Sequence, residues 1–199
     1  MGAVLAGGRS SRMGADKSTI EVDGVTMLDR AAAALGDAGC VPVVSVGGAK
    51  RDNSHVADLH PGEGPLGGVV TALAHTCELG AEAVVVVACD MPSLNGSTIS
   101  RLVDAHRRGG GGRVVAAEGD RVEPMCALWP VMIAAEVNEM FQAGERSVAG
   151  ALDRLDPRLV PIESSVLANV NTPDDLQRLA DSVIDRGHVG RASGDGRLR

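Results

Sequence analysis

Short apolar runs alternate along the chain with longer segments in which apolar residues recur every three or four positions. The runs are typical of buried strands, and the longer segments are typical of helices with one buried face. The predicted strands are 3–5, 41–46, 83–89, 114–117, 125–129 and 159–162. The predicted helices are 27–38, 69–79, 130–141, one that begins at Ser97 and one that begins within 144–148. Because most strands lie too far apart for hairpins, we expect a three-layer α/β/α fold around a Rossmann-like, mostly parallel sheet, with some antiparallel pairing near its edge.

The stretch 83–89 is the most apolar of the chain and is predicted to be the central strand. It is followed by Asp90. Open α/β sheets bind ligands at the carboxyl ends of their strands, and Mg²⁺ is usually held by one carboxylate together with phosphate oxygens and waters. The alternative is that Asp90 caps the helix that begins at Ser97, but a proline and an Asn-Gly pair lie between them. We therefore predict that Asp90 is a magnesium ligand.

The stretch from Leu5 to Ser18 follows the first predicted strand and combines three glycines with two arginines and a lysine. Glycines let backbone N–H groups approach an anion, and the cations neutralise its charge, so this stretch is predicted to bind a polyphosphate. A surface turn is the alternative, although turns seldom gather three cations. Lys17 also stands out, because the chain has only one other lysine among nineteen basic residues. The spacing excludes a Walker A loop and a dinucleotide-binding Gly-x-Gly-x-x-Gly loop.

Two asparagines, Asn169 and Asn171, stand at a predicted strand end, with their amides directed out of it. The residues that follow mark the start of a helix, because Thr172 and Asp175 have the spacing of a capping box and Pro173 takes the first helical position. We therefore expect Asp175 to be structural and the two asparagines to be available to a ligand.

The composition excludes several classes of function. A net charge of −7 and a pI near 5.2 argue against binding to nucleic acid or to an anionic membrane. One tryptophan, one phenylalanine and no tyrosine leave no stacking platform for single strands. The longest apolar run is too short to cross a bilayer, and no charged and hydrophobic leader opens the sequence. With four widely spaced cysteines, read as buried free thiols, the sequence indicates a cytoplasmic protein.

The end of the chain has a different composition from the rest. After about residue 186 it becomes rich in Gly, Arg, Ser and Asp without periodicity. We therefore expect one domain over residues 1–186 and a disordered tail over residues 187–199.

The sequence Leu-Ala-Gly-Gly-x-Ser-x-Arg-Met-Gly-x-Asp-Lys, from Leu5 to Lys17, resembles the signature of nucleotidyltransferases. In this form it is most similar to that of the molybdenum cofactor guanylyltransferases (MobA-type). Further stretches similar to motifs of that family are 64–68, 118–128, 144–148 and 169–176, although Glu123 stands where glutamine is usual. The resemblance covers most of residues 3–180 and implies the fold of the nucleotide-diphospho-sugar transferases.

The resemblance also implies roles for individual residues. Asp58, six residues before Gly64, matches the family's carboxylate that binds the guanosine part of GTP, and a carboxylate can accept hydrogen bonds from guanine or ribose. Arg146, Asn169 and Asn171 match the acceptor side, where either asparagine completes the Mg²⁺ shell or holds the pterin. For Arg146, a solvated arginine at a helix start is an equal alternative. The implied GTP-binding residues are Leu5, Ala6, Gly7, Gly8, Lys17, Asp58 and Asp90, with one of Ser45, Val46 and Gly47, and the implied catalytic residues are Arg12, Lys17 and Asp90.

The implied reaction is transfer of GMP from GTP to the terminal phosphate of molybdopterin (Mo-molybdopterin). Pyrophosphate leaves, and the guanine dinucleotide form of the cofactor is the product. Mg²⁺ on Asp90 is the expected metal cofactor, and Lys17 and Arg12 would stabilise the charge that develops at the α-phosphate. No general base is needed, because a phosphate dianion is already nucleophilic.

Three alternatives stay open. Within the same class, the donor could be CTP, or the acceptor could be another small phosphorylated molecule. Asparagine at positions 169 and 171 favours the guanylyltransferase, because the cytidylyl relatives tend to carry aspartates there. From another class, a non-catalytic protein could carry GTP or the finished cofactor, although Asp90 together with Lys17 argues against it. Molybdoenzyme apoproteins or their chaperones are candidate protein partners.

Overall fold

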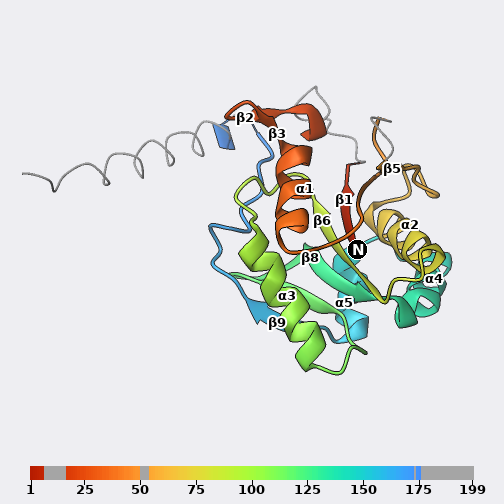
Figure 1. Cartoon of the computed structure of the whole chain (residues 1–199). Coiled ribbons are helices and arrows are strands. Elements are labelled where there is room, and N and C mark those ends of the chain that lie inside the picture. The colour runs from red at the N-terminus through yellow and green to blue at the C-terminus, as the bar shows by residue number, and fades with distance from the viewer. Residues whose placement is uncertain (7–16, 50–53, 173, 176–199) are drawn as a thin grey trace, which may run out of the picture.

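At the centre of the molecule lies a seven-stranded sheet with the strand order β5-β4-β1-β6-β8-β7-β9 (Figure 1). The computed structural model describes residues 1–6, 17–49, 54–172 and 174–175. The strands of the sheet are β1 (Gly2–Leu5), β4 (Val43–Val46), β5 (His55–Val56), β6 (Ala83–Ala88), β7 (Val115–Glu118), β8 (Val122–Pro130) and β9 (Arg158–Pro161). The strand predicted to be central, β6, is the fourth of the seven in the sheet.

Parallel and antiparallel pairs are combined in this sheet. The pairs β5-β4, β4-β1, β1-β6 and β7-β9 are parallel, whereas β8 runs antiparallel to both of its neighbours, β6 and β7. The antiparallel pairing expected near an edge is the β8-β7 pair, next to the edge strand β9, but β8 also pairs directly with the central strand β6. Only residues 119–121 separate β7 from β8, so that the two strands form a hairpin inside the sheet. The strand predicted at 159–162 is β9, which contains Pro161 and lies at the edge of the sheet, where a proline costs no ladder hydrogen bond.

Helices cover both faces of the sheet, which gives the three layers that the sequence predicts. Helices α1 and α3 lie side by side on one face, and α2, α4 and α5 cover the other (Figure 1). In β6, Val85 and Val87 face α1 and α3, while Val84 and Val86 face the opposite layer. Since both faces of this strand are buried, it needs an unbroken apolar run. The bounds of the helices are α1 (Met27–Asp37), α2 (Pro65–Glu78), α3 (Gly96–Arg108), α4 (Ala134–Gln142) and α5 (Val148–Leu155), with short 3-10 turns at Lys17–Thr19 and Val131–Ile133.

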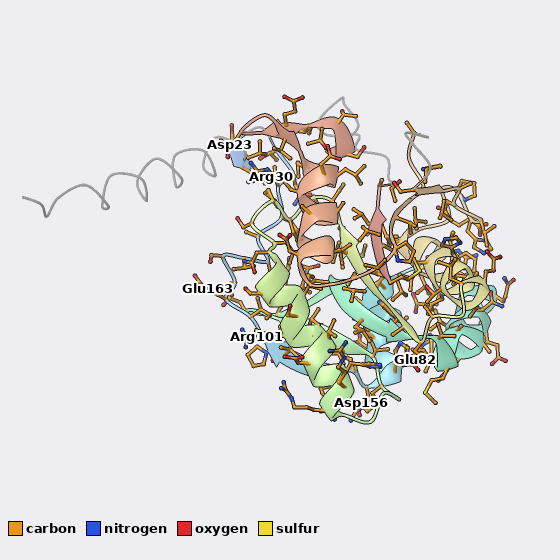
Figure 2. The ribbon with its side chains drawn as sticks, in the orientation of Figure 1. Asp23, Arg30, Glu82, Arg101, Asp156 and Glu163 are labelled. Carbon is orange, nitrogen blue, oxygen red and sulfur yellow. The ribbon has the colours of Figure 1, made fainter. Side chains whose placement is uncertain are left out.

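A small hairpin leads into α1. Strands β2 (Glu21–Val22) and β3 (Val25–Thr26) pair antiparallel across Asp23 and Gly24, whose φ angles are 52° and 75°. Two positive φ angles in succession are typical of the tight turn that Asp-Gly favours. Arg30 of α1 points toward Asp23, with 3.1 Å between Nη2 and Oδ2 (Figure 2). This ion pair helps to hold the hairpin against the helix.

Several helix starts differ from the prediction. Helix α2 begins at Pro65 rather than at residue 69, because proline fits the first position of a helix. Helix α3 is capped by Asn95, whose side-chain oxygen accepts a hydrogen bond from the Thr98 N–H at 3.0 Å, and not by Ser97. Since Asn95 fills that position, Asp90 is not the cap of α3. Residues 130–133 end β8 and form a 3-10 turn, so the next helix, α4, begins at Ala134.

The four cysteines are free thiols, as predicted. Cys40, Cys89 and Cys126 are buried, but Cys77 on α2 is exposed, so the expectation of burial was wrong for that residue. Within the described segments, no helix combines the length and the apolar character needed to cross a membrane.

Candidate active site

Three parallel strands end at the same level of the sheet. Leu5 of β1 lies opposite Val46 of β4 on one side and opposite Ala88 of β6 on the other. Beyond them, the N–H of Ala6 donates to the Val46 carbonyl at 2.9 Å. The predicted phosphate loop therefore leaves β1 at the edge where Asp90 follows β6. Because the Leu5 side chain is buried in the core, only its backbone is available to a nucleotide.

The remaining residues of the predicted phosphate loop cannot be placed in the same way. Gly7, Gly8 and Arg12 lie outside the described residues, and for Lys17 only the backbone is described, at the start of the 3-10 turn Lys17–Thr19. Their predicted contacts with the triphosphate therefore stay predictions.

The loop that follows β4 runs close beside the start of the phosphate loop. Gly47 and Gly48 both have φ angles of +71°, and a Cβ on Gly48 would lie 2.9 Å from the carbonyl oxygen of Ala6. Only glycine combines that conformation with that close approach. This arrangement supports the predicted nucleotide contact near Ser45, Val46 and Gly47 without deciding between them.

Asp58 lies in the loop between β5 and α2 and is half-buried. Its Oδ1 accepts a hydrogen bond from the His60 N–H at 2.9 Å and lies 3.0 Å from the hydroxyl of Thr71 on α2. Its Oδ2 makes no hydrogen bond with the described part of the chain, so this oxygen is available to a ligand. Asp58 thus fastens its own loop to α2, and its predicted contact with guanosine stays a prediction.

Asp90 lies next to the two asparagines that the sequence singled out. The backbone N–H of Val170 donates to the carbonyl oxygen of Asp90 at 2.8 Å, and this fixes residues 169–171 alongside the end of β6. The predicted capping box follows directly, because Thr172 N–H donates to Asp175 Oδ2 at 2.8 Å and Asp175 N–H donates to Thr172 Oγ1 at 3.2 Å. The segment 169–171 is not a strand, so the asparagines are held by these hydrogen bonds rather than by the sheet.

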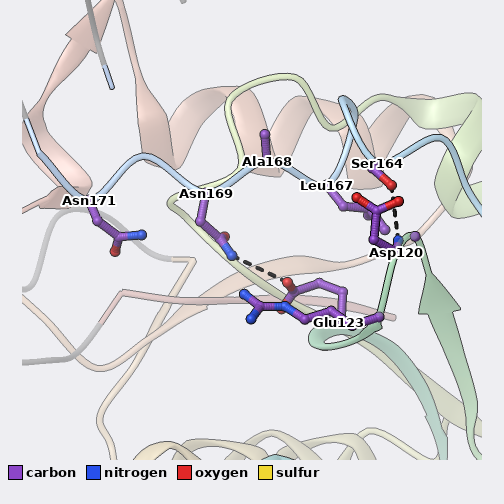
Figure 3. A pocket seen from close by; sticks show the side chains of 9 residues that line it. Asp120, Glu123, Ser164, Leu167, Ala168, Asn169 and Asn171 are labelled. Carbon is purple, nitrogen blue, oxygen red and sulfur yellow. Dashed lines mark hydrogen bonds between the residues drawn. The ribbon is translucent and has the colours of Figure 1, made fainter. Parts of the chain in front are cut away.

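A cavity of about 470 Å³ opens beside this segment (Figure 3). Its walls are the turn between β7 and β8, the first part of β8 and the chain that follows β9. Asn169 and Asn171 both line it. The lining residues are Gly119, Asp120, Arg121, Glu123, Ser164, Leu167, Ala168, Asn169 and Asn171.

The contact that joins two walls of this cavity had no signal in the sequence. The N–H of Asp120 donates to the Ser164 hydroxyl at 2.9 Å, which joins the β7-β8 turn to the chain after β9. A Cβ on Gly119 would lie only 2.9 Å from the same oxygen. This contact links residues more than forty positions apart, so no local pattern could predict it.

A β-bulge directs Glu123 into the site. The partner of β7 changes from Ala127, opposite Ala116, to Glu123, opposite Ala117, so several residues of β8 loop out of the pairing. Glu123 is 7% exposed, and its carboxylate accepts hydrogen bonds from Asn169 Nδ2 at 3.2 Å and from the Met125 N–H at 3.1 Å. Glu123, which stands where the family usually has glutamine, thus lies directly behind Asn169.

Arg146 lies among the helices instead of lining the cavity. Its guanidinium donates to the carbonyls of Phe141 and Glu145 and to Glu63 Oε2 at 3.1 Å, and it lies 4.1 Å from the centroid of the Phe141 ring. The carbonyl of Arg146 also accepts the N–H of Leu66 near the start of α2 at 3.2 Å. These contacts hold the guanidinium instead of leaving it free in solvent, as the alternative supposed, and the predicted contact of Arg146 with the acceptor is untested.

No side chain in the described part of the site suggests covalent chemistry. Burial raises the pKa of the Cys126 thiol to about 12, and the nearby charge of Glu123 adds to this effect. A thiol with that pKa is protonated at neutral pH and is a poor nucleophile. Among the described residues, no group of three or more His, Cys, Asp and Glu side chains could hold a metal ion.

The predicted phosphate loop after the first strand and the carboxylate after the central strand of a three-layer α/β sheet are typical of proteins that bind a nucleotide at the carboxyl ends of the strands. The family model described as "MobA-like NTP transferase domain" matches residues 2–157. The chain belongs to this family.

Individual relatives agree with this assignment. A protein of Opitutus terrae named "Probable molybdenum cofactor guanylyltransferase" is 37% identical over 189 residues, which cover 89% of this chain and 93% of the relative. Other relatives, 33–35% identical, are named molybdenum cofactor guanylyltransferase.

Solved structures share the fold. The molybdopterin-guanine dinucleotide biosynthesis protein A of Archaeoglobus fulgidus has a TM-score of 0.72 and 26% identity, over 93% of this chain and 98% of that protein. Rv0371C of Mycobacterium tuberculosis, whose structure contains manganese, has a TM-score of 0.67 and 20% identity over 91% of this chain and 97% of that protein.

Proposed function

We propose that the protein transfers GMP from GTP to the terminal phosphate of molybdopterin (Mo-molybdopterin). Pyrophosphate is released, and molybdopterin guanine dinucleotide is formed. The observation that carries the proposal is the hydrogen bond between Val170 and Asp90, because it brings a carboxylate at the nucleotide edge of the sheet next to a cavity lined by Asn169 and Asn171. The names of the relatives supply the donor and the acceptor.

The donor side of the proposed site is the edge formed by β1, β4 and β6. The triphosphate would lie along the stretch from Leu5 to Ser18, and the backbone N–H groups of that stretch, Arg12 and Lys17 would neutralise its charge. Asp58 would accept a hydrogen bond from the guanosine through Oδ2.

A divalent metal ion is part of the proposal, with Mg²⁺ as the physiological ion. The donor set fits Mg²⁺, which commonly takes one or two protein oxygens and completes its shell with substrate phosphates and waters. Asp90 would supply a carboxylate oxygen, and Asn171 or Asn169 an amide oxygen. When bound, the ion neutralises charge on the α-phosphate and on the leaving pyrophosphate.

The chain's own residues would act by positioning and by electrostatic stabilisation. The acceptor phosphate attacks the α-phosphorus of GTP in line, a new P–O bond forms and the bond between the α- and β-phosphates breaks. Lys17 and Arg12 would meet the charge that increases on the leaving group. This mechanism needs no protein nucleophile, in agreement with the protonated Cys126 thiol. We also propose that Arg146 contacts the acceptor phosphate.

One assay distinguishes the proposed function from its alternatives. Purified protein is supplied with Mg²⁺ and molybdopterin, and pyrophosphate release is measured with GTP, CTP or no triphosphate. We expect release with GTP that depends on molybdopterin. Release with CTP alone would assign the protein to the cytidylyl branch, and binding of GTP or of the finished cofactor without release would favour a carrier.

Location and protein partners are proposed on the same basis. A cytoplasmic location agrees with four cysteines that remain free thiols. Delivery of the product to a molybdoenzyme apoprotein or its chaperone is the proposed next step.

A further inference from the structure

Glu123 is a buried carboxylate behind the acceptor side of the cavity (Figure 3). Each of its oxygens has one partner in the described chain, since Oε1 accepts the Met125 N–H at 3.1 Å and Oε2 accepts Asn169 Nδ2 at 3.2 Å. A carboxylate can only accept hydrogen bonds. Glu123 therefore requires Asn169 to turn its amide nitrogen toward β8.

The orientation of the Asn169 amide decides what the cavity offers to a ligand. With Nδ2 directed at Glu123, the carbonyl oxygen Oδ1 has no hydrogen-bond partner among the residues that the structure describes. Asn169 is half-buried and lines the cavity, so Oδ1 is the polar atom that it contributes to a ligand. A carbonyl oxygen recognises a hydrogen-bond donor and rejects another acceptor.

We propose that Glu123 is a positioning residue that fixes the Asn169 amide with its oxygen toward the acceptor. The acceptor is then held at this point through an N–H donor, such as those of a nitrogen heterocycle. This inference rests on the proposed function, and it adds a role for Glu123 together with the hydrogen-bond polarity of the acceptor subsite.

A glutamine at position 123 would reverse this polarity. The Met125 N–H needs an acceptor, so it would take the single oxygen of the glutamine. The glutamine NH₂ group would then face Asn169, whose amide must turn to accept with Oδ1. The Asn169 NH₂ group would in consequence point into the cavity, where it opposes an N–H donor of the ligand.

Steady-state kinetics of the full chain test this inference. We expect Glu123→Gln to raise the KM for molybdopterin about 10- to 100-fold, because one hydrogen bond is lost and two donors oppose each other. The KM for GTP should stay within twofold of the wild type. Glu139→Gln, an equivalent change at an exposed position of α4, is the control and should change neither constant.

A double variant separates orientation from simple packing. In E123Q/N169D the glutamine NH₂ group donates to the new carboxylate at position 169, whose second oxygen faces the cavity as Oδ1 does in the wild type. We expect this variant to regain most of the molybdopterin affinity lost in E123Q. N169D alone places two carboxylates side by side and should be worse than the double variant. An E123Q variant with an unchanged molybdopterin KM, or a double variant without recovery, would overturn the inference.

The amide orientation can also be measured without turnover, which keeps this inference distinct from the proposed function. In ¹H–¹⁵N spectra, N169D identifies the Asn169 side-chain signals by their loss. We expect slow exchange of one Asn169 Nδ2 proton in the wild type, and transfer of that protection to the introduced glutamine in E123Q. Equal exchange in both proteins would contradict the role of Glu123. A wild type that transfers no nucleotide but shows this protection would contradict only the proposed function.

Discussion

The backbone N–H of Val170 donates a hydrogen bond to the carbonyl oxygen of Asp90 at 2.8 Å. The two residues are eighty positions apart, yet Asp90 is itself a residue that the sequence singled out for chemistry, and Val170 lies between two others, Asn169 and Asn171. Through this bond the end of the central strand and the asparagine segment meet at one edge of the sheet. A reaction between a nucleotide on one side and a phosphorylated acceptor on the other requires such a meeting point.

Removing the carboxylate of Asp90 should stop turnover. We expect Asp90→Ala and Asp90→Asn to lower kcat at least about 100-fold, because the proposed metal ligand is lost. The thermal midpoint should stay close to that of the wild type, since the backbone bond to Val170 is kept. Asp104→Asn, at an exposed position of α3, is the control. Near-normal turnover in Asp90→Asn would remove Asp90 from the metal site.

The role of Lys17 can be tested by mutation with a matched control, since Lys50 is the chain's other lysine. We expect Lys17→Ala to lower kcat/KM for GTP about 100-fold or more, because a cation next to the developing charge is lost. Lys17→Arg should recover only part of this, since the two cations differ in shape. Lys50→Ala should behave as the wild type. Equal effects of the two alanine variants would show that the loss reflects general charge.

Asp58 needs a design that separates its structural contacts from ligand binding. We expect Asp58→Asn to raise the KM for GTP about tenfold, through loss of a charge-assisted hydrogen bond. Thr71→Val removes the hydroxyl that lies 3.0 Å from Asp58 Oδ1 but keeps the carboxylate. It should lower the thermal midpoint and leave the KM for GTP near the wild-type value. If both variants raise the KM equally, Asp58 acts only by holding its loop on α2.

How much of this site the sequence could predict depends on how local the signals are. The central strand and the capping box at Thr172 follow from patterns within a few residues, and the structure places both as expected. The asparagine pair was predicted at a strand end, but the segment 169–171 is not a strand. The interior position of β8 and the contact of Asp120 with Ser164 depend on pairing between distant segments. Such pairing leaves no periodicity in the sequence, so neither the position of β8 nor the contact of Asp120 with Ser164 could be predicted.

The lowered pKa of Glu145 predicts how the stability of the folded protein changes with pH. The pKa of its carboxyl is lowered below 4.5, first because it accepts the Ser147 N–H at 2.9 Å and then through the Arg146 N–H and the charges of Arg154 and Arg146. A lowered folded-state pKa means that this carboxylate stabilises the fold fully above pH 4.5, and that the contribution is lost as the pH falls through the folded-state value.

We therefore expect Glu145→Gln to lower the thermal midpoint at pH 7, with a smaller difference from the wild type in strongly acidic buffer. Melting curves between pH 7 and the acid limit of folding measure this. Glu139→Gln is again the control, and it should follow the wild type at each pH. A difference for Glu145→Gln that grows as the pH falls would have the wrong sign.

The central claim is that the acceptor attacks the α-phosphorus of GTP at the edge formed by Asp90 and the asparagine segment. The most direct test follows the label from [α-³²P]GTP and from [γ-³²P]GTP in reactions with molybdopterin and Mg²⁺. The account predicts that the α label appears in the guanine dinucleotide product and the γ label in pyrophosphate, in equal amounts. Label from the γ position in the product, or no labelled product with either substrate, would contradict it.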